Sequence, residues 1–167
     1  MLMKWIVGIV LSLALAFAIL FLLGRKTFHA EITIDATPEE VWSVLTDVSN
    51  YAAWNPLLVP ISGEIREGAK VEYRMTQPDG TQSIMKSRVR KVVALKELHQ
   101  HAGIPGILTA HHSYRLEPTQ GGTRLIQHEV DNGVAMLFWD SSWVQPTYKE
   151  VNQALKRRVE GLRESQQ

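Results

Sequence analysis

The sequence contains no cysteine, so it can form no disulfide bonds and has no thiol for catalysis or metal binding. It also lacks a glycine-rich phosphate-binding loop, a G-x-S-x-G nucleophile motif and an H-E-x-x-H metal motif. These absences argue against redox, phosphoryl-transfer and thiol chemistry. They give no reason to expect a cofactor.

An excess of either charge is missing as well. The 18 Lys and Arg residues nearly balance the 17 Asp and Glu residues, for a net charge of +1. Proteins that bind nucleic acid usually carry a strong positive field, and this chain has none. Nucleic acid is therefore not an expected partner.

One long apolar run is present, from Trp5 to Leu23, and it contains no charged residue. At about 1.5 Å per residue a helix over this run extends roughly 28 Å, close to the hydrocarbon thickness of a bilayer. A secretory signal has a shorter apolar stretch and a small-x-small cleavage site, whereas this run ends in Phe-Leu-Leu-Gly-Arg-Lys. We therefore predict an uncleaved membrane anchor over residues 1–25, rather than a cleaved signal or a buried core helix. Its membrane-contacting side chains include Trp5, Phe17, Phe21 and Leu23.

The charges that flank the run do not assign an orientation. Lys4 lies on one side, and Arg25 and Lys26 lie on the other. The side with more Lys and Arg normally stays in the cytoplasm, and here the two sides are nearly equal. The prediction is a single-pass membrane protein whose soluble domain is not assigned to either side.

Residues 26–167 are long enough for one domain with its own core. Apolar and polar residues alternate from Phe28 to Asp35, which predicts a half-buried strand. A helix is expected to follow, because Thr37 is a good N-cap, Pro38 suits the first helical position and Glu40 completes a capping box.

The rest of the domain predicts strands and then one long helix. A second short helical turn is expected over residues 51–54. The strand-like stretches are residues 71–75, 84–93, 95–101, 108–117 and 123–130, joined by short turns typical of antiparallel hairpins. Apolar residues spaced three and four apart predict a helix from Pro146 to Arg163. The predicted fold class is α+β: a curved antiparallel sheet of about six to seven strands around a long C-terminal helix, preceded by a transmembrane helix. A cavity between such a sheet and helix is a usual ligand site.

Several motifs occur in an order and at spacings typical of one superfamily. They are ITIDATPEEVW (Ile32 to Trp42), DVSNYAAWNP (Asp47 to Pro56), GIPG (Gly103 to Gly106), HSYRLEP (His112 to Pro118) and GGTR (Gly121 to Arg124), with Glu129 and Gly133. The chain resembles the START-like or SRPBCC superfamily, the helix-grip fold, and within it the bacterial polyketide cyclase/dehydrase and lipid transport branch. The resemblance implies a helix-grip cavity for a hydrophobic molecule. It supplies no catalytic motif, and the N-terminal anchor departs from the usual pattern.

The resemblance also implies a place for the segment Trp54-Asn55-Pro56, which crosses the open end of the grip. Trp54 is expected to cover one end of the cavity, or alternatively to fill the core there. Asn55 is expected to bond loop backbone groups, and Pro56 to stop the helix. The predicted pocket residues are Tyr51, Trp54, Tyr73, Met75, Met85, His112, Tyr114, Glu129 and Trp139.

Histidines are concentrated between residues 99 and 128. A hairpin about the GIPG turn is expected to place His99 opposite His112, and a hairpin about residues 120–121 to place His112 opposite Glu129. Cross-strand neighbours lie about 4.5–5.5 Å apart, so the three side chains would meet on one face. Such a cluster is compatible with a zinc site, an acid–base pair or an ordinary polar contact, and we predict no metal.

Two surface features each have two or more interpretations. Lys86, Arg88 and Arg90 alternate along a strand, which indicates a solvated outer face or a contact with anionic lipid headgroups. The run MLFWDSSW from Met136 to Trp143 is compatible with a pocket mouth, a bilayer contact or packing of the last helix.

Three functions follow from these patterns. The first is a membrane-anchored binding module for a lipid or another hydrophobic small molecule. The second is a cyclase- or dehydratase-type enzyme that uses His112 and Glu129 as acid–base groups, which requires the two side chains to lie within hydrogen-bond reach inside the cavity. The third is a membrane interaction protein whose cavity has collapsed.

Overall fold

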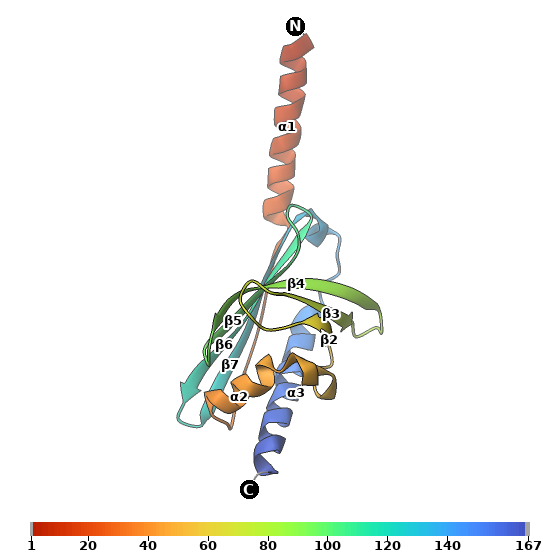
Figure 1. The fold of residues 1–167 in the computed structure, drawn as a ribbon. Coiled ribbons are helices and arrows are strands. Elements are labelled where there is room, and N and C mark those ends of the chain that lie inside the picture. Colours follow the sequence, from red (N-terminus) through yellow and green to blue (C-terminus); the bar gives the residue numbers. More distant parts are fainter. Residues whose placement is uncertain (1, 166–167) are drawn as a thin grey trace.

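The computed structural model describes residues 2–165, and within that range the chain folds into three α-helices, two 3₁₀ helices and seven strands (Figure 1). In chain order they are α1 (Leu2–Leu23), β1 (Arg25–Ile34), α2 (Pro38–Thr46), η1 (Val48–Ala53), β2 (Leu58–Gly63), β3 (Lys70–Thr76), β4 (Gln82–Val93), β5 (Glu97–Ile104), β6 (Leu108–Thr119), β7 (Gly122–Asn132), η2 (Val134–Leu137) and α3 (Val144–Glu164).

The seven strands form one antiparallel sheet in the order β1-β7-β6-β5-β4-β3-β2. The sheet curves around α3, which confirms the predicted helix-grip architecture (Figure 1). Sequence patterns did not predict β2. Pro60 and a register shift between Pro60 and Ser62 interrupt its alternation, and proline is tolerated there because β2 is an edge strand.

The predicted capping box of α2 is present. The Thr37 hydroxyl accepts a hydrogen bond from Glu40 N, and the Glu40 carboxylate accepts one from Thr37 N at 2.7 Å. Val41 and Leu45, on the inner side of α2, are fully buried. The box therefore fixes where the helix begins, and so which of its residues enter the core.

α3 packs against β1 and β7 at one side of the sheet. Its buried stripe includes Tyr148, Val151, Leu155 and Val159, as the helical spacing predicted. On the inner face of β3 to β6 the burial is mixed. Tyr73, Val89, Leu98 and Tyr114 are buried, whereas Met75, Met85, Ala102, Ala110 and His112 retain partial exposure.

Side chains of α3 also cover the free edge of β1. Gln145 accepts from His29 N at 2.9 Å and donates to His29 O. Further along, Lys156 donates to Thr33 O at 2.7 Å, and Glu160 accepts from Asp35 N at 2.9 Å. An uncovered strand edge is a template for aggregation, so these bonds protect the sheet while they position the helix.

α1 projects away from the sheet and continues directly into β1 through Gly24 (Figure 1). The segment Met3–Phe21 is long and apolar enough to cross a membrane, and none of it is buried in the fold. Membrane anchors and signal sequences share these properties.

Candidate functional site

Strand pairing brings His112 and Glu129 together on the concave face. β6 and β7 pair His112 with Glu129, as predicted. Along β7, Leu125, Gln127, Glu129 and Asp131 are all buried because alternate residues of a strand point to the same face. The acid–base alternative required the two side chains to lie within hydrogen-bond reach inside a cavity. The register places both on the concave face, but among the described residues the hydrogen bond of the His112 ring is to Gln127 and not to Glu129.

His99 does not join them, so the predicted three-residue cluster is wrong. β5 pairs Gln100 with His112, and His99 pairs with Ser113. The loop from β5 to β6 has an odd number of residues centred on Gly106, and the register is one residue away from the predicted one. A slip of one residue sends a side chain to the opposite face, where His99 Nε2 lies 3.3 Å from Glu97 Oε2.

The concave face carries two adjacent cross-strand rows of residues. The first row runs Ser87, Ala102, Ala110, Asp131 and Lys26 across five strands. The second runs Val89, Gln100, His112, Glu129 and Phe28. We call the first row the small-residue row, because Ala102 and Ala110 at its centre are small, and both are partly exposed.

His112 sits in an aromatic environment. Its ring lies edge-on to Tyr114 and Tyr148, with centroid separations of 4.6 and 5.6 Å. Its Nε2 lies 3.0 Å from the side-chain amide nitrogen of Gln127. Burial lowers the pKa of His112 to about 3, since the charged ring loses its hydration, and so the ring is neutral near pH 7.

Glu129 and Asp131 form a buried carboxyl pair on β7. Burial raises the pKa of Glu129, and the neighbouring Asp131 carboxyl raises it further, while the facing Tyr148 hydroxyl opposes the rise. Burial also raises the pKa of Asp131, partly offset by Glu129 and Lys26. The pair therefore holds a proton at higher pH than exposed carboxyl groups do.

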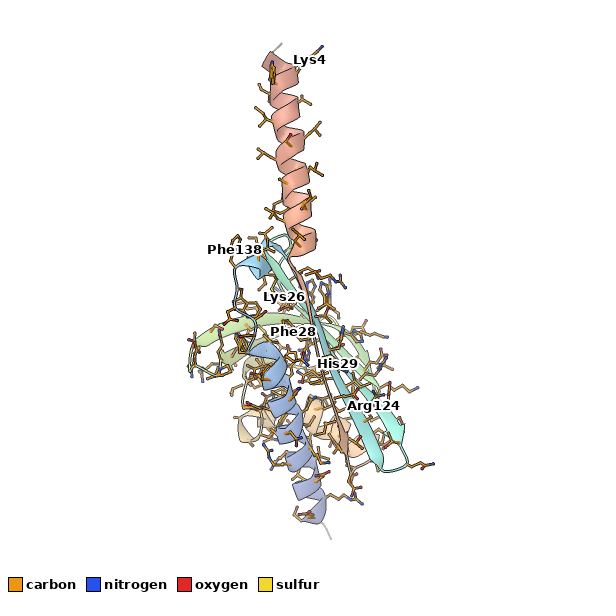
Figure 2. The ribbon with its side chains drawn as sticks, turned by 180° about the vertical axis from the view of Figure 1, so that it is seen from behind. Lys4, Lys26, Phe28, His29, Arg124 and Phe138 are labelled. Carbon is orange, nitrogen blue, oxygen red and sulfur yellow. The ribbon has the colours of Figure 1, made fainter. Side chains whose placement is uncertain are left out.

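Lys26 connects this pair to the segment after η2. It projects from β1 opposite Asp131, and its Nζ donates to Ser141 Oγ at 2.9 Å and to Trp139 O. Figure 2 shows Lys26 just below the end of α1, with Phe28 next along the strand. The ammonium group is thus bonded to the loop while it faces the acidic end of the small-residue row.

Several deeply buried polar atoms are unpaired within the described range, residues 2–165. Asp131 is 2% exposed, and its Oδ1 has no hydrogen-bond donor there other than the proton that the carboxyl pair holds. Within the same range no hydrogen-bond partner is present for Gln127 Oε1, Ser87 Oγ or either amide atom of Asn152. Gln127 and Asn152 are each 1% exposed. An unpaired buried polar group costs about 1–3 kcal/mol, so these atoms indicate polar partners that the chain itself does not provide.

The other predicted pocket residues are distributed around this site. Tyr51, Trp54, Tyr73 and Tyr114 belong to the buried core, and Met75, Met85 and Trp139 pack against it while partly exposed. The Tyr73 hydroxyl accepts from Gln100 Nε2 at 2.8 Å, which links β3 to the second row.

Trp54 is almost fully buried and lies edge-on to Tyr51 at 4.8 Å, as the core-packing alternative described. Asn55 Oδ1 accepts from Leu57 N and Leu58 N, both at 2.9 Å, which confirms its predicted loop role.

Sequence reasoning missed Gln100, Gln127, Asp131, Tyr148 and Asn152, as well as the small-residue row. The alternation that places Glu129 on the inner face of β7 also places Gln127 and Asp131 there, so the sequence pattern could have predicted both. Tyr148 and Asn152 lie on the buried side of α3, and only the packing of helix on sheet brings them to the polar groups.

The charged stripe on β4 is exposed at Lys86, Arg88 and Arg90, as expected for a solvated face. The residues of the MLFWDSSW run differ in burial: Met136 is buried in the core, while Phe138 is exposed. Trp139 and Trp143 pack edge-on at 5.8 Å. In residues 2–165 no three His, Asp or Glu side chains are arranged to hold a metal ion.

Two surface hollows flank α3. One, of about 430 Å³, lies between β1 and α3 and is lined by His29, Ala30, Glu31, Ile32, Lys149, Asn152 and Gln153. The other, of about 460 Å³, lies between Trp54 and α3 and shares Lys149 and Gln153 with the first. Asn152 connects the first hollow to the buried side of α3.

Comparisons with solved structures show the same fold. A Rhodobacter sphaeroides protein matches with a TM-score of 0.65 at 19% identity, over 82% of this chain and 93% of that one. A Staphylococcus aureus protein of unknown function matches with a TM-score of 0.66 at 14% identity, over 86% and 97%. The di-domain ARO/CYC BexL from the BE-7585A biosynthetic pathway matches with a TM-score of 0.65 at 13% identity, over 81% of this chain and 50% of that one.

No curated protein matches this chain significantly. Residues 25–160, however, match the family described as polyketide cyclase / dehydrase and lipid transport. That range begins where β1 begins and ends within α3, so it contains the whole sheet and the polar rows on its concave face. The chain therefore belongs to the polyketide cyclase / dehydrase and lipid transport family.

Proposed function

We propose that this chain is a membrane-anchored binding protein, which holds a hydrophobic small molecule with hydroxyl or carbonyl groups on the concave face of its sheet. The observation that carries the proposal is the buried Ser87 Oγ in the small-residue row, which has no hydrogen-bond partner within residues 2–165, together with the buried Asp131 carboxyl in the same row. Such atoms orient a ligand whose remaining surface is apolar.

The surroundings of these atoms suit that class of ligand. Aromatic rings of Tyr73, Tyr114 and Tyr148 lie among the polar groups, and Met75 and Met85 on the inner face are partly exposed. The neutral His112 ring and the Glu129 carboxyl, whose pKa is raised by burial, add hydrogen-bonding groups. Both activities in the family's description involve hydrophobic molecules, which supports the same class.

The anchor is the second part of the proposal. Residues 1–25 would span the bilayer as α1, with Trp5, Phe17, Phe21 and Leu23 toward lipid, and residues 26–167 would form the binding domain. None of Met3–Phe21 is buried, which supports this division, since a core helix would be covered by the fold.

A titration tests the binding. The full chain in detergent micelles would be titrated with 1,8-dihydroxyanthraquinone, a hydrophobic probe with hydroxyl and carbonyl groups, while tryptophan fluorescence is followed. Ala110→Leu fills the small-residue row beside Asp131, and Ala52→Leu places the same bulk on the exposed side of η1. We expect saturable quenching in wild type and Ala52→Leu, and at least a tenfold weaker midpoint in Ala110→Leu. Linear quenching that is equal in all three proteins would indicate partition into the micelle and contradict the proposal.

A second candidate function rests on the carboxyl pair and its neighbour His112. A carboxyl group with a raised pKa can donate a proton at higher pH than an exposed one, and a neutral imidazole can accept a proton. Proton exchange at the central carbon of dibenzoylmethane, followed by NMR in deuterated buffer, tests this function. Faster exchange with wild type than with Glu129→Gln would favour the enzyme, and equal rates would reject it.

A further inference from the structure

We propose that one end of the domain itself enters the bilayer beside α1, so that the protein contacts the membrane at two places. The inserted surface consists of the β5–β6 hairpin tip and η2 with the residue after it; its exposed apolar side chains are Ile104, Ile107, Leu137 and Phe138. This inference rests on the proposed anchor, because α1 fixes the depth of the surface.

The hairpin tip reaches alongside α1, above its last turn. A methyl group added at Gly106 would lie 3.5 Å from Phe17 Cζ. Phe17 precedes the end of α1 at Leu23 by six residues, or roughly 9 Å at 1.5 Å rise per residue. If α1 spans the membrane over Met3–Phe21, the tip lies at the level of a residue within the span.

The composition of this surface fits lipid rather than water. Residues 102–110 and 132–139 contain no charged side chain. Phe138 is 88% exposed, Ile104 62% and Ile107 52%. Figure 2 shows Phe138 beside the end of α1 that meets the domain, whereas Lys4 is at the far end. Large apolar side chains grouped around the base of a membrane helix are expected at the bilayer interface.

Most polar backbone groups of the tip, though not Gly106 N or Pro105 O, are bonded within the described part of the chain. Ile107 N donates to Ile104 O at 3.1 Å, and Pro105 carries no N–H. The carbonyls of Gly106 and Ile107 accept from Val134 N and Ala135 N in η2, at 3.3 and 3.0 Å. Non-helical backbone tolerates lipid only when its polar groups are bonded within the protein.

The position of the surface relative to α1 is fixed by close backbone contacts. Gly133 N donates to Gly24 O at 3.1 Å, which ties η2 to the end of α1. A Cβ at Gly133 would lie 2.2 Å from Ile107 O, so the hairpin tip also closes on this glycine. The domain is therefore held directly against the end of α1.

The absence of cysteine makes a depth measurement direct. Single-cysteine variants of the full chain would carry an NBD fluorophore in phosphatidylcholine vesicles, and quenching by spin-labelled lipids would be measured. The test variants are Ile107→Cys and Phe138→Cys. Leu15→Cys reports the anchor, and Gln120→Cys reports the β6–β7 turn, at the opposite end of the sheet from α1 (Figure 1).

We expect strong quenching at Leu15, Ile107 and Phe138, and none above background at Gln120. Quenching at Leu15 with Ile107 and Phe138 at the Gln120 level would overturn the second contact and leave the anchor intact. A lack of quenching at Leu15 would show that α1 is outside the bilayer, which overturns both proposals.

Discussion

At the scale of single residues, the buried carboxyl pair is the group whose behaviour departs most from that of exposed side chains. Glu129 is held between Asp131 and Tyr148, away from water. Because its pKa is raised in the folded state, the folded chain binds more protons than the unfolded chain above the ordinary pKa of 4.5. This difference reduces stability as pH rises from that value through the raised one.

The first prediction uses this pH dependence. Glu129→Gln resembles the protonated carboxyl and cannot ionise. The free energy of unfolding of the variant minus that of wild type should therefore be near zero at pH 4 and increase as pH rises. This difference should exceed about 1 kcal/mol by pH 8, because each tenfold change in the acid dissociation constant of Glu129 corresponds to about 1.4 kcal/mol. Urea unfolding followed by tryptophan fluorescence measures it. His112 contributes stability that is lost as pH falls from 6.5 toward about 3. This loss occurs in both proteins, so it cancels when their stabilities are subtracted.

Glu150→Gln makes the same chemical change on the exposed side of α3 and serves as the control. A relative stability of Glu129→Gln that stays as flat as that of Glu150→Gln would show that the carboxyl pair does not titrate abnormally.

How much of the site was predictable differs between these residues. The turn at residues 120–121 determined the pairing of His112 with Glu129, and the pairing was predicted correctly. For the GIPG turn the predicted register was wrong by one residue, and Gln100, rather than His99, lies opposite His112. The lack of a partner for Ser87 Oγ within residues 2–165 follows from three-dimensional packing, which no local pattern in the sequence reports.

At the scale of elements, α3 both closes the concave face and protects the edge of β1. Gln145 bonds both backbone groups of His29, so removing its amide should cost about 1 kcal/mol of stability. The second prediction is that Gln145→Ala has this lower stability, and that the His29 amide exchanges with deuterium at least several-fold faster.

Gln153→Ala is the matched control, since Gln153 lies on the same helix and is exposed. Unchanged protection of the His29 amide in Gln145→Ala would mean that the side chain does not secure the edge.

Element prediction succeeded where one physical signal was strong. The capping box set the start of α2, and three–four spacing set α3 within two residues at each end. β2 was missed because its sequence contains Pro60 and Gly63, which normally argue against a strand. Its position at the sheet edge is what makes those residues acceptable, and edge position is a property of the assembled sheet.

At the scale of the whole molecule, a glycine junction joins the apolar helix to the domain. Gly133 has φ +138, and an added Cβ would meet the Ile107 carbonyl. The third prediction is that Gly133→Ala lowers stability by about 2 kcal/mol or more and moves the hairpin tip away from α1. In the vesicle experiment, quenching at Ile107 should fall while quenching at Leu15 is unchanged.

Gly161→Ala provides a contrast of opposite sign. Nothing lies within 4 Å of a Cβ at Gly161, which is inside α3. Alanine favours a helix over glycine by about 0.5–1 kcal/mol, so this variant should be slightly more stable than wild type. If Gly133→Ala also matched or exceeded wild-type stability, the junction would not be the tight contact described.

The central claim, that the concave face holds a hydrophobic molecule, is tested most directly by native mass spectrometry. The full chain would be extracted in mild detergent and released from micelles in the gas phase, with solvent extraction of anything that co-purifies. The account predicts an adduct of one defined mass on wild type, reduced at least tenfold on Ala110→Leu and retained on Ala52→Leu. A bare protein mass for wild type, unchanged after incubation with total membrane lipids, would contradict it.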